Sequence, residues 1–238
     1  MNEILNFIGI GSAFNTKLGN TSAFICKQDS MILIDCGGTV FHRLTELKLL
    51  EGLEQLNIII THTHPDHIGS LGEVVFFAHY ALKIVPTIYF PDKELMGKFL
   101  ECIGVESKMV ELIADSEAII SSEFGNLGLS FLTVSHLLTI PAYGFILEAN
   151  GSRIYYSGDS NEIPESIMKR FIDGNLDYIY QDTCGLDYDG NAHLSLRKLC
   201  EIIPSDLRGK VICIHHDKFL DIEKVKAEGF QLPSVYRK

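Results

Sequence analysis

The sequence predicts an α/β fold whose strands form two β-sheets. Short β-rich runs bounded by Gly, Asn, Asp and Ser alternate with apolar residues at helical spacing, and a second series of strands begins near residue 127. The chain has 238 residues, enough for one large domain with a substantial core, so we expect a single domain over residues 1–238. Its hydrophobic share of 46% and charged share of 21% are those of an ordinary globular protein.

The first half of the chain is predicted to place a β-sheet before a histidine-rich segment. Strands are expected over 4–8, 22–26 and 31–35, a helix over 40–50 and a buried strand over 56–60. After the histidines, the pattern predicts a helix over 68–82, a strand over 84–90 and one or two helices over 93–113. We interpret this last stretch as the connection between two lobes.

The second half is predicted to begin a new sheet and then to alternate helices with strands. Strands are expected over 127–134, 143–148 and 153–156, with Asn150-Gly151 as a hairpin turn between the last two. They are followed by a helix over 162–173, a strand over 177–181, a helix over 194–202, a strand over 211–214 and a helix over 221–228.

Charge and terminal features limit the partners and location of the chain. Twenty basic against 31 acidic residues give a formal net charge of −11, which repels a long polyanion such as RNA. No apolar stretch approaches the roughly 18 residues that span a bilayer, and the start Met1-Asn2-Glu3-Ile4 lacks the basic region of a signal peptide. We therefore expect no long nucleic acid, no membrane and a cytoplasmic location. The six cysteines form no CxxC pair and are expected to be reduced core thiols: Cys26, Cys36, Cys102, Cys184, Cys200 and Cys213.

Four metal-compatible side chains occur within six residues, directly after a predicted buried strand. His62 and His64 alternate onto one side of an extended segment, and Asp66 and His67 follow within one turn of a helix start. Pro65 suits this change, because its fixed φ fits the first helical turn and no backbone donor is needed there. Imidazole and carboxylate make zinc the expected metal, although manganese, iron or cobalt also accept such ligands.

Four local ligands cannot complete two metal sites, so further ligands are sought at the ends of later strands. Three positions qualify: His136, Asp159 and the pair His215-His216. A single His or Asp at a strand end is more often a structural residue. Their joint order after one metal motif nevertheless favours a shared site.

The order and spacing of these motifs resemble the ribonuclease Z branch of the metallo-β-lactamase superfamily over nearly the whole chain. The further matching segments are the Gly-Ser-Ala loop within 9–14, Asn20-Thr21-Ser22, the Asp-Cys-Gly strand end within 33–38, and Ser157-Gly158-Asp159-Ser160. The resemblance implies an αββα four-layer sandwich with two mixed β-sheets and two metal ions. According to this resemblance, one metal would be held by His62, His64 and His136, and the other by Asp66, His67 and His215. Asp159 would contact both metals, and His216 is the alternative to His215 as the last ligand.

The resemblance also implies a hydrolytic mechanism. Two metals lower the pKa of a bridging water, so a hydroxide would be the nucleophile, and Asp66 would orient it and accept its proton. His193 matches a histidine that such enzymes use near the leaving group, and it is the candidate general acid. Asp182 falls where they carry its carboxylate partner, although Glu is common there. His42 and His79 lie in predicted helices without a partner motif and are assigned no role.

The expected substrate is small. Members of this branch that process transfer RNA insert a protruding arm between the counterparts of His136 and Asp159, but here two predicted strands nearly fill that interval. The chain resembles the compact phage-type anti-Pycsar phosphodiesterases, which hydrolyse 3′,5′-cyclic nucleotides including cyclic CMP and cyclic UMP and remove an antiviral signal. That resemblance implies a zinc phosphodiesterase acting on these and on cyclic AMP and cyclic GMP, manganese as an alternative metal, a homodimer, and the host cytoplasm if a phage encodes it. Two alternatives stay open: a ribonuclease Z-like RNA 3′-end endonuclease, and a zinc-stabilised protein that sequesters a nucleotide without cleaving it.

Overall fold

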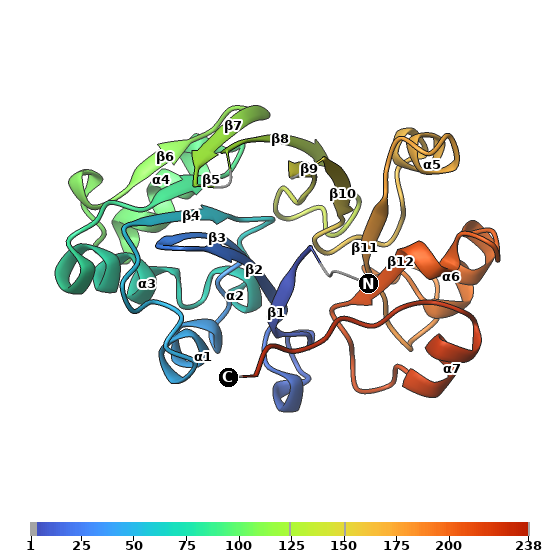
Figure 1. The fold of residues 1–238 in the computed structure, drawn as a ribbon. Coiled ribbons are helices and arrows are strands. Elements are labelled where there is room, and N and C mark those ends of the chain that lie inside the picture. The colour runs from blue at the N-terminus through green and yellow to red at the C-terminus, as the bar shows by residue number, and fades with distance from the viewer. Residues whose placement is uncertain (1–3, 124, 150, 238) are drawn as a thin grey trace.

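The protein folds into four layers, with two β-sheets face to face and helices on both outer sides (Figure 1). The structure is a computed structural model that describes residues 4–123, 125–149 and 151–237. Each sheet has six strands, in the orders β1-β2-β3-β4-β5-β6 and β12-β11-β10-β9-β8-β7. Both sheets mix parallel and antiparallel pairs, which confirms the predicted αββα sandwich with two mixed sheets.

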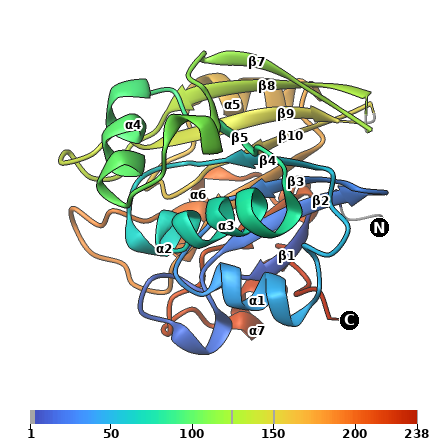
Figure 2. The ribbon, with the colours of Figure 1, turned by 90° about the vertical axis from the view of Figure 1, so that its left-hand side faces the viewer.

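The first sheet is antiparallel at its start and parallel from β3 onward. Its strands are β1 (Asn6–Gly9), β2 (Ser22–Lys27), β3 (Ser30–Ile34), β4 (Gln55–Ile59), β5 (Thr87–Tyr89) and β6 (Glu111–Ile113). Parallel neighbours require crossovers, and here the crossovers contain helices that cover the outer face of the sheet (Figure 2). The helices are α1 (Val40–Glu46), α2 (Pro65–Ile68), α3 (Leu71–Phe77) with a π-helical turn (Ala78–Leu82), and α4 (Lys93–Cys102).

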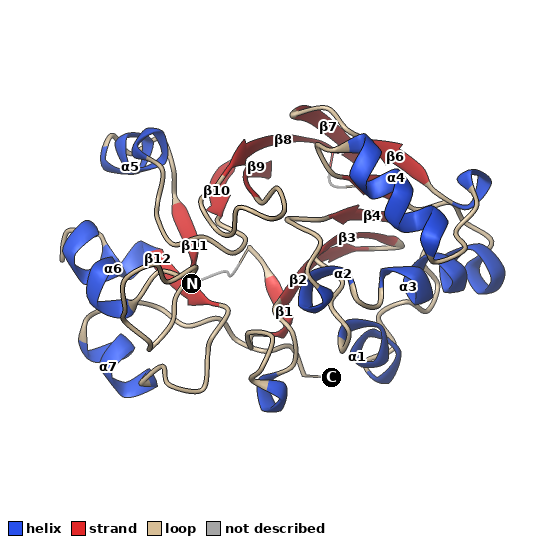
Figure 3. Ribbon diagram, turned by 180° about the vertical axis from the view of Figure 1, so that it is seen from behind, coloured by secondary structure: helices blue, strands red, loops and turns tan. Residues whose placement is uncertain are grey.

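The second sheet repeats this arrangement in reverse order. Its strands are β7 (Glu117–Ser122), β8 (Gly125–Thr133), β9 (Tyr143–Ala149), β10 (Ser152–Tyr156), β11 (Tyr178–Asp182) and β12 (Val211–Ile214). Antiparallel hairpins form β7 to β10, and parallel pairs join β10 to β11 and β11 to β12. The outer helices on this side are α5 (Glu165–Ile172), α6 (Leu196–Ile202) and α7 (Ile222–Ala227), seen opposite α1 to α4 in Figure 3. Short 3-10 turns occupy Thr16–Leu18, Ser107–Met109 and Arg208–Lys210.

Successive side chains of a strand point to opposite faces of the sheet and therefore pack into different layers. On β3, Met31 and Leu33 pack with the helices outside the first sheet, whereas Ile32 and Ile34 join the core between the sheets. Phe145 and Ile154 of the second sheet lie in that same inner core. Because the inner core draws on both sheets, it fixes the sheets relative to each other and places their strand ends at a common edge.

Several sequence predictions of secondary structure are wrong. Residues 111–113 form β6 rather than the end of a helix, and β7 was not predicted at all. The stretch 68–113 is therefore not a connection between lobes, because β5 and β6 complete the first sheet and the chain enters the second sheet between β6 and β7. Helix α1 ends at Glu46, short of the predicted residue 50.

The other predicted elements agree more closely with the structure. Strand β12 has the predicted bounds, and the hairpin predicted between β9 and β10 is present. Asn150 lies outside the described residues, while Gly151 has the left-handed φ of 80° that such a turn needs. No helix in the described part is long and apolar enough to cross a membrane. All six cysteines are free thiols, as predicted, but Cys26 and Cys102 are exposed and do not belong to the core.

Candidate metal site between the two sheets

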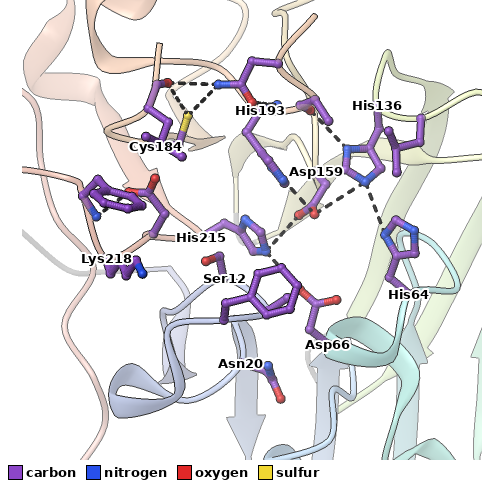
Figure 4. Close-up of a pocket in the computed structure, with 18 of the residues that line it drawn as sticks. Ser12, Asn20, His64, Asp66, His136, Asp159, Cys184, His193, His215 and Lys218 are labelled. Carbon is purple, nitrogen blue, oxygen red and sulfur yellow. Dashed lines mark hydrogen bonds and ion pairs between the residues drawn. The ribbon is translucent and has the colours of Figure 1, made fainter. Parts of the chain in front are cut away.

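The metal-compatible residues predicted from the sequence meet at one pocket of about 910 Å³, where His64, Asp66, His136, Asp159 and His215 line the floor and His62 and His67 are buried beside them (Figure 4). His62, His64, Asp66 and His67 come from the first sheet and follow β4 directly. From the second sheet, one residue follows each of three strands: His136 after β8, Asp159 after β10 and His215 after β12. The site therefore lies where the carboxyl ends of strands from both sheets face each other.

The histidine motif changes from strand to helix at Pro65. His64 is extended, with φ −70° and ψ 150°, and Pro65 occupies the first turn of α2, where it needs no backbone partner. The motif is anchored at its start, because the backbone N–H of Thr61 donates to Asp35 Oδ1 at 2.8 Å. Thr61 and His62 are fully buried, so this part of the motif has little freedom to move.

Three histidine nitrogens and one carboxylate oxygen form the first donor group. His64 Nδ1 lies 3.0 Å from His62 Nε2 and 3.3 Å from His136 Nε2. Asp159 Oδ2 lies 3.7 Å from His62 Nε2 and 3.9 Å from His136 Nε2. The four donor atoms converge and could hold one metal ion.

The second donor group uses the other oxygen of Asp159. Asp159 Oδ1 lies 3.2 Å from His67 Nε2 and 3.4 Å from His215 Nε2. Asp66 Oδ2 closes the group, at 3.4 Å from His67 Nε2 and 3.3 Å from His215 Nε2. These four residues could hold a second ion. One carboxylate, Asp159, thus presents one oxygen to each group.

The spacing and the unsatisfied polar atoms both fit metal binding. Tetrahedral ligands about 2.0–2.2 Å from a zinc ion stand roughly 3.3–3.6 Å from one another, close to the separations in both groups. His67 Nε2 and Asp159 Oδ1 are buried and have no hydrogen-bond partner among the described residues. A buried polar atom without a partner is costly, and a metal ion at this point would satisfy both atoms.

Hydrogen bonds on the side away from the pocket orient the candidate ligand histidines. His67 Nδ1 donates to Asp35 Oδ2 at 2.8 Å, and His136 Nδ1 donates to the carbonyl of Ala192 at 3.1 Å. Each bond places a proton on Nδ1 and makes Nε2 the ring nitrogen that faces the site. Asp35 was assigned no role from the sequence. Its only sequence signal is a carboxylate that directly follows a buried strand, whereas its complete burial and its left-handed φ of 57° are visible only in the structure.

Charge within the cluster shifts the pKa values in opposite directions. Burial lowers the pKa of His62 and keeps it neutral. Burial would also lower the pKa of His67, but the carboxylates of Asp159 and Asp35 raise it well above its ordinary value. Burial acts to raise the pKa of Asp159, and His215 together with His67 more than offset this and hold it well below its usual range. The cluster is thus built around ionised carboxylates.

His193 and Asp182 form a pair beside the donor groups. His193 Nδ1 donates to Asp182 Oδ2 at 2.6 Å, so the shorter Asp side chain reaches the imidazole. The charge of Asp182 raises the pKa of His193 although burial opposes it. Asp182 Oδ1 also lies 3.4 Å from His215 Nδ1, which links this pair to the second donor group. The side chain of His193 is 30% exposed and lines the pocket, whereas Asp182 is fully buried.

His216, the alternative last ligand, lies outside both donor groups. Its Nε2 donates to the carbonyl of Cys213 at 2.7 Å, and its backbone N–H donates to the carbonyl of Ile10. His42 and His79 are also remote from the cluster. His42 pairs with Glu46 on α1, and the ring of His79 packs on Tyr80.

Above the polar floor, the rim of the pocket is largely apolar. Exposed large hydrophobic side chains gather there: Phe14, Leu137, Leu186, Tyr188 and Phe219. Phe14 is 93% exposed although its turn is held in place, since Asn15 N–H donates to the Ser12 carbonyl and Asn15 Nδ2 donates to the His216 carbonyl. Lys218 is the one lysine or arginine among the described residues that line the pocket. This rim could not be predicted from the sequence, because its members come from loops that are distant along the chain.

Comparison with known proteins places the chain in a family. Residues 4–232 match the family described as Anti-Pycsar protein Apyc1. The Anti-Pycsar protein Apyc1 of Paenibacillus harenae is 26% identical over 227 residues, covering 91% of each chain. That of Bacillus phage vB_BsuM-Goe3 is 27% identical over 234 residues, covering 89% of this chain and 88% of the phage protein.

A solved structure supports the fold. The metallo-β-lactamase fold protein YhfI from Bacillus subtilis superposes with a TM-score of 0.74 at 19% sequence identity, covering 98% of this chain and 95% of that protein. At this identity the likeness speaks for the fold alone. It confirms the metallo-β-lactamase fold that the sequence motifs implied.

Proposed function

The chain belongs to the Anti-Pycsar protein Apyc1 family, and from this membership we propose that it is a metal-dependent phosphodiesterase of 3′,5′-cyclic mononucleotides. Its substrates would be cyclic CMP and cyclic UMP, and also cyclic AMP and cyclic GMP, each opened to a linear nucleoside monophosphate. The observation that carries the proposal is Asp159, whose two oxygens each point into a separate donor group on the pocket floor. Removing such a nucleotide would counter a cyclic-nucleotide antiphage signal.

The donor set fits two zinc ions, with manganese as an alternative. His62, His64 and His136 would hold one ion, Asp66, His67 and His215 the other, and Asp159 both. When bound, two such ions roughly 3.5–4 Å apart supply an activated water and positive charge that offsets the charge of the phosphate.

Asp66 is the proposed proton acceptor. It is a helix-start carboxylate that lines the pocket, and its Oδ2 faces His67 and His215. Burial acts to raise its pKa, but its contacts with His215 and His67 lower it well below the usual range. The lowered pKa keeps this carboxylate ionised, so it can accept a hydrogen bond from a water and orient it; uptake of the proton is the further role proposed for Asp66.

His193 is the proposed proton donor to the leaving oxygen. Asp182 accepts from its Nδ1–H and raises its pKa, which favours the doubly protonated imidazole that a proton donor needs. His193 lines the pocket next to the donor groups, where it can reach a substrate oxygen. Asp182 holds the ring orientation and stabilises its positive charge.

The shape of the pocket supports a small substrate over RNA. The interval between His136 and Asp159 consists of a short loop and the β9–β10 hairpin, so it contains no protruding arm. A cyclic nucleotide has a charged phosphate for the polar floor and a flat base for the aromatic rim around Phe14 and Phe219. The net charge of −11 further opposes binding of a long polyanion.

One chromatographic experiment separates the three candidate functions. Zinc-loaded and manganese-loaded protein is incubated with each of the four cyclic mononucleotides and with one precursor transfer RNA. Linear monophosphates as products support the proposal, and absence of turnover across the cyclic panel removes it. Cleavage of the RNA alone supports the endonuclease, and stoichiometric binding without product supports a sequestering protein.

Two further proposals concern the assembly and location of the chain. We propose a homodimer, which sedimentation equilibrium would test by a mass near twice the 26.6 kDa of the chain. We also propose that it acts in the cytoplasm, where its nucleotide substrates are made, and that this is the host cytoplasm if a phage encodes it. Fractionation of the producing cells tests the location.

A further inference from the structure

Asn20 lies at the entrance to β2 and lines the pocket, yet the proposed mechanism gives it no task. Two hydrogen bonds tie it to Thr39. Its backbone N–H donates to Thr39 Oγ1 at 2.8 Å, and its side-chain Oδ1 accepts from the Thr39 backbone N–H at 3.0 Å. Asn20 and Thr39 thus fix each other, although 19 positions separate them along the chain.

The bond to Thr39 decides which way the Asn20 amide points. A backbone N–H can only donate, so the side-chain atom facing Thr39 must be the oxygen, and the NH₂ group must lie on the opposite side. Figure 4 shows the nitrogen end of Asn20 turned toward the residues of the pocket and the oxygen end turned away. Within the described part of the chain, Nδ2 has no hydrogen-bond partner. The Asn20 NH₂ group is therefore a donor of fixed orientation that faces the pocket.

The same donor is held rigidly relative to the metal-ligand motif. The segment before Thr39 is bonded to the motif, since Cys36 N–H donates to the His67 carbonyl at 2.6 Å and Gly38 N–H donates to the Pro65 carbonyl at 3.2 Å. At Gly37, a side chain would collide with both the backbone of Asp66 and Cβ of Asn20. Such close packing leaves the Asn20 amide little room to shift.

On the basis of the proposed function, we propose that Asn20 Nδ2 donates a hydrogen bond to an oxygen of the cyclic sugar-phosphate. Among the described residues that line the pocket, Lys218 is the only lysine or arginine beside the acidic side chains of Asp66, Asp159 and Asp217, and Asn20 adds a donor without adding charge. Because the amide is fixed before the substrate arrives, the bond forms without ordering another side chain. Asn20 is thus a substrate-positioning residue.

The test compares Asn20→Asp with Thr39→Val. In Asn20→Asp, Oδ1 still accepts from Thr39, but a negative oxygen replaces the NH₂ group. In Thr39→Val, the bond from Asn20 N–H to Oγ1 is lost while the amide of Asn20 remains. kcat and KM are measured on zinc-loaded protein with cyclic CMP and with bis(4-nitrophenyl) phosphate, which has no sugar, alongside zinc content and the thermal midpoint. The zinc content of both variants should equal that of the wild type, since neither residue is a metal ligand.

We expect Asn20→Asp to lower kcat/KM at least about 10- to 100-fold, the effect of one hydrogen bond to a charged group, and Thr39→Val to lower it less than about 3-fold. In Asn20→Ala, which removes the donor without adding a charge, a loss with both substrates identifies a phosphate oxygen as the acceptor, and a loss with cyclic CMP alone identifies a sugar oxygen. If Asn20→Asp behaves like Thr39→Val with both substrates, the proposal is overturned. Should Asn20→Asp not fold, Asn20→Ala replaces it in the same comparison. Wild-type protein that hydrolyses only bis(4-nitrophenyl) phosphate would refute the cyclic-nucleotide substrate while still testing Asn20 on that ester.

Discussion

The two halves of the candidate metal site are built in different ways. The first sheet contributes four residues from one continuous segment, His62 to His67, with Asp35 of the neighbouring strand end behind them. The second sheet contributes single residues from separate strand ends and loops: His136, Asp159, Asp182, His193 and His215. The first half depends on local backbone geometry, whereas the second depends on the strand order β8-β9-β10-β11-β12 within the second sheet. The half that is scattered in sequence contains the residue common to both donor groups, Asp159.

Asp159→Ala is expected to have the largest effect, because this carboxylate belongs to both donor groups. Zinc content should fall from about two ions per chain toward none, and turnover of cyclic CMP should fall by at least about 10³-fold. Metal analysis and product chromatography measure both quantities. Asp115→Ala, which alters an exposed carboxylate, is the control. Full activity of Asp159→Ala would show that the second half of the site is dispensable.

His193→Ala should separate catalysis from metal binding within the second half. Loss of a general acid costs about 10²- to 10⁴-fold in kcat, while the zinc content should stay at the wild-type value. His193 could instead be a metal ligand, because its donor atom lies in a group that could hold an ion together with Asp159, Asp182 and His215. Loss of zinc from His193→Ala would assign His193 to metal binding instead. His42→Ala, on the exposed face of α1, serves as the control.

Asp35→Asn tests the support behind the first half. In the wild type, Thr61 N–H and His67 Nδ1–H each donate to a different oxygen of Asp35. Asparagine has only one side-chain oxygen, so one of these two donors loses its acceptor. Loss of such a supporting carboxylate typically lowers metal affinity about 10- to 100-fold. Competition with a zinc-binding dye measures the affinity, and Asp29→Asn provides a comparison away from the cluster. An unchanged affinity would mean that Asp35 serves folding alone.

Phe14→Ala should give the smallest effect. If the rim stacks on the base, KM for cyclic CMP should rise about 5- to 50-fold while kcat changes little. Stability should be unaffected, because the ring is 93% exposed. Tyr80→Ala, another exposed aromatic that lies away from the pocket, should leave KM unchanged. An equal KM for Phe14→Ala and wild type would remove the rim from base recognition.

The errors in the predicted fold concern β6 and β7. Strand β6 has only three residues, and its apolar members continue the pattern of the preceding helix, so periodicity alone assigned it to helix. Strand β7 is at an edge of its sheet and mixes Glu and Ser with apolar residues. Its register comes from pairing with β8, as in Ile120 opposite Leu127, and this pairing is not visible in the segment itself.

The sequence by itself predicted the histidine motif and the candidate ligands at strand ends, because a buried strand followed by a polar side chain is a local pattern. It could not determine that Asp159 turns one oxygen to each donor group, that Asp182 reaches His193, or that His215 rather than His216 faces the cluster. The last choice depends on the backbone at the end of β12, where His215 adopts a left-handed φ of 59°. Asp35, Asn20 and the apolar rim also emerged only in the tertiary structure, since each acts through neighbours that are distant along the chain.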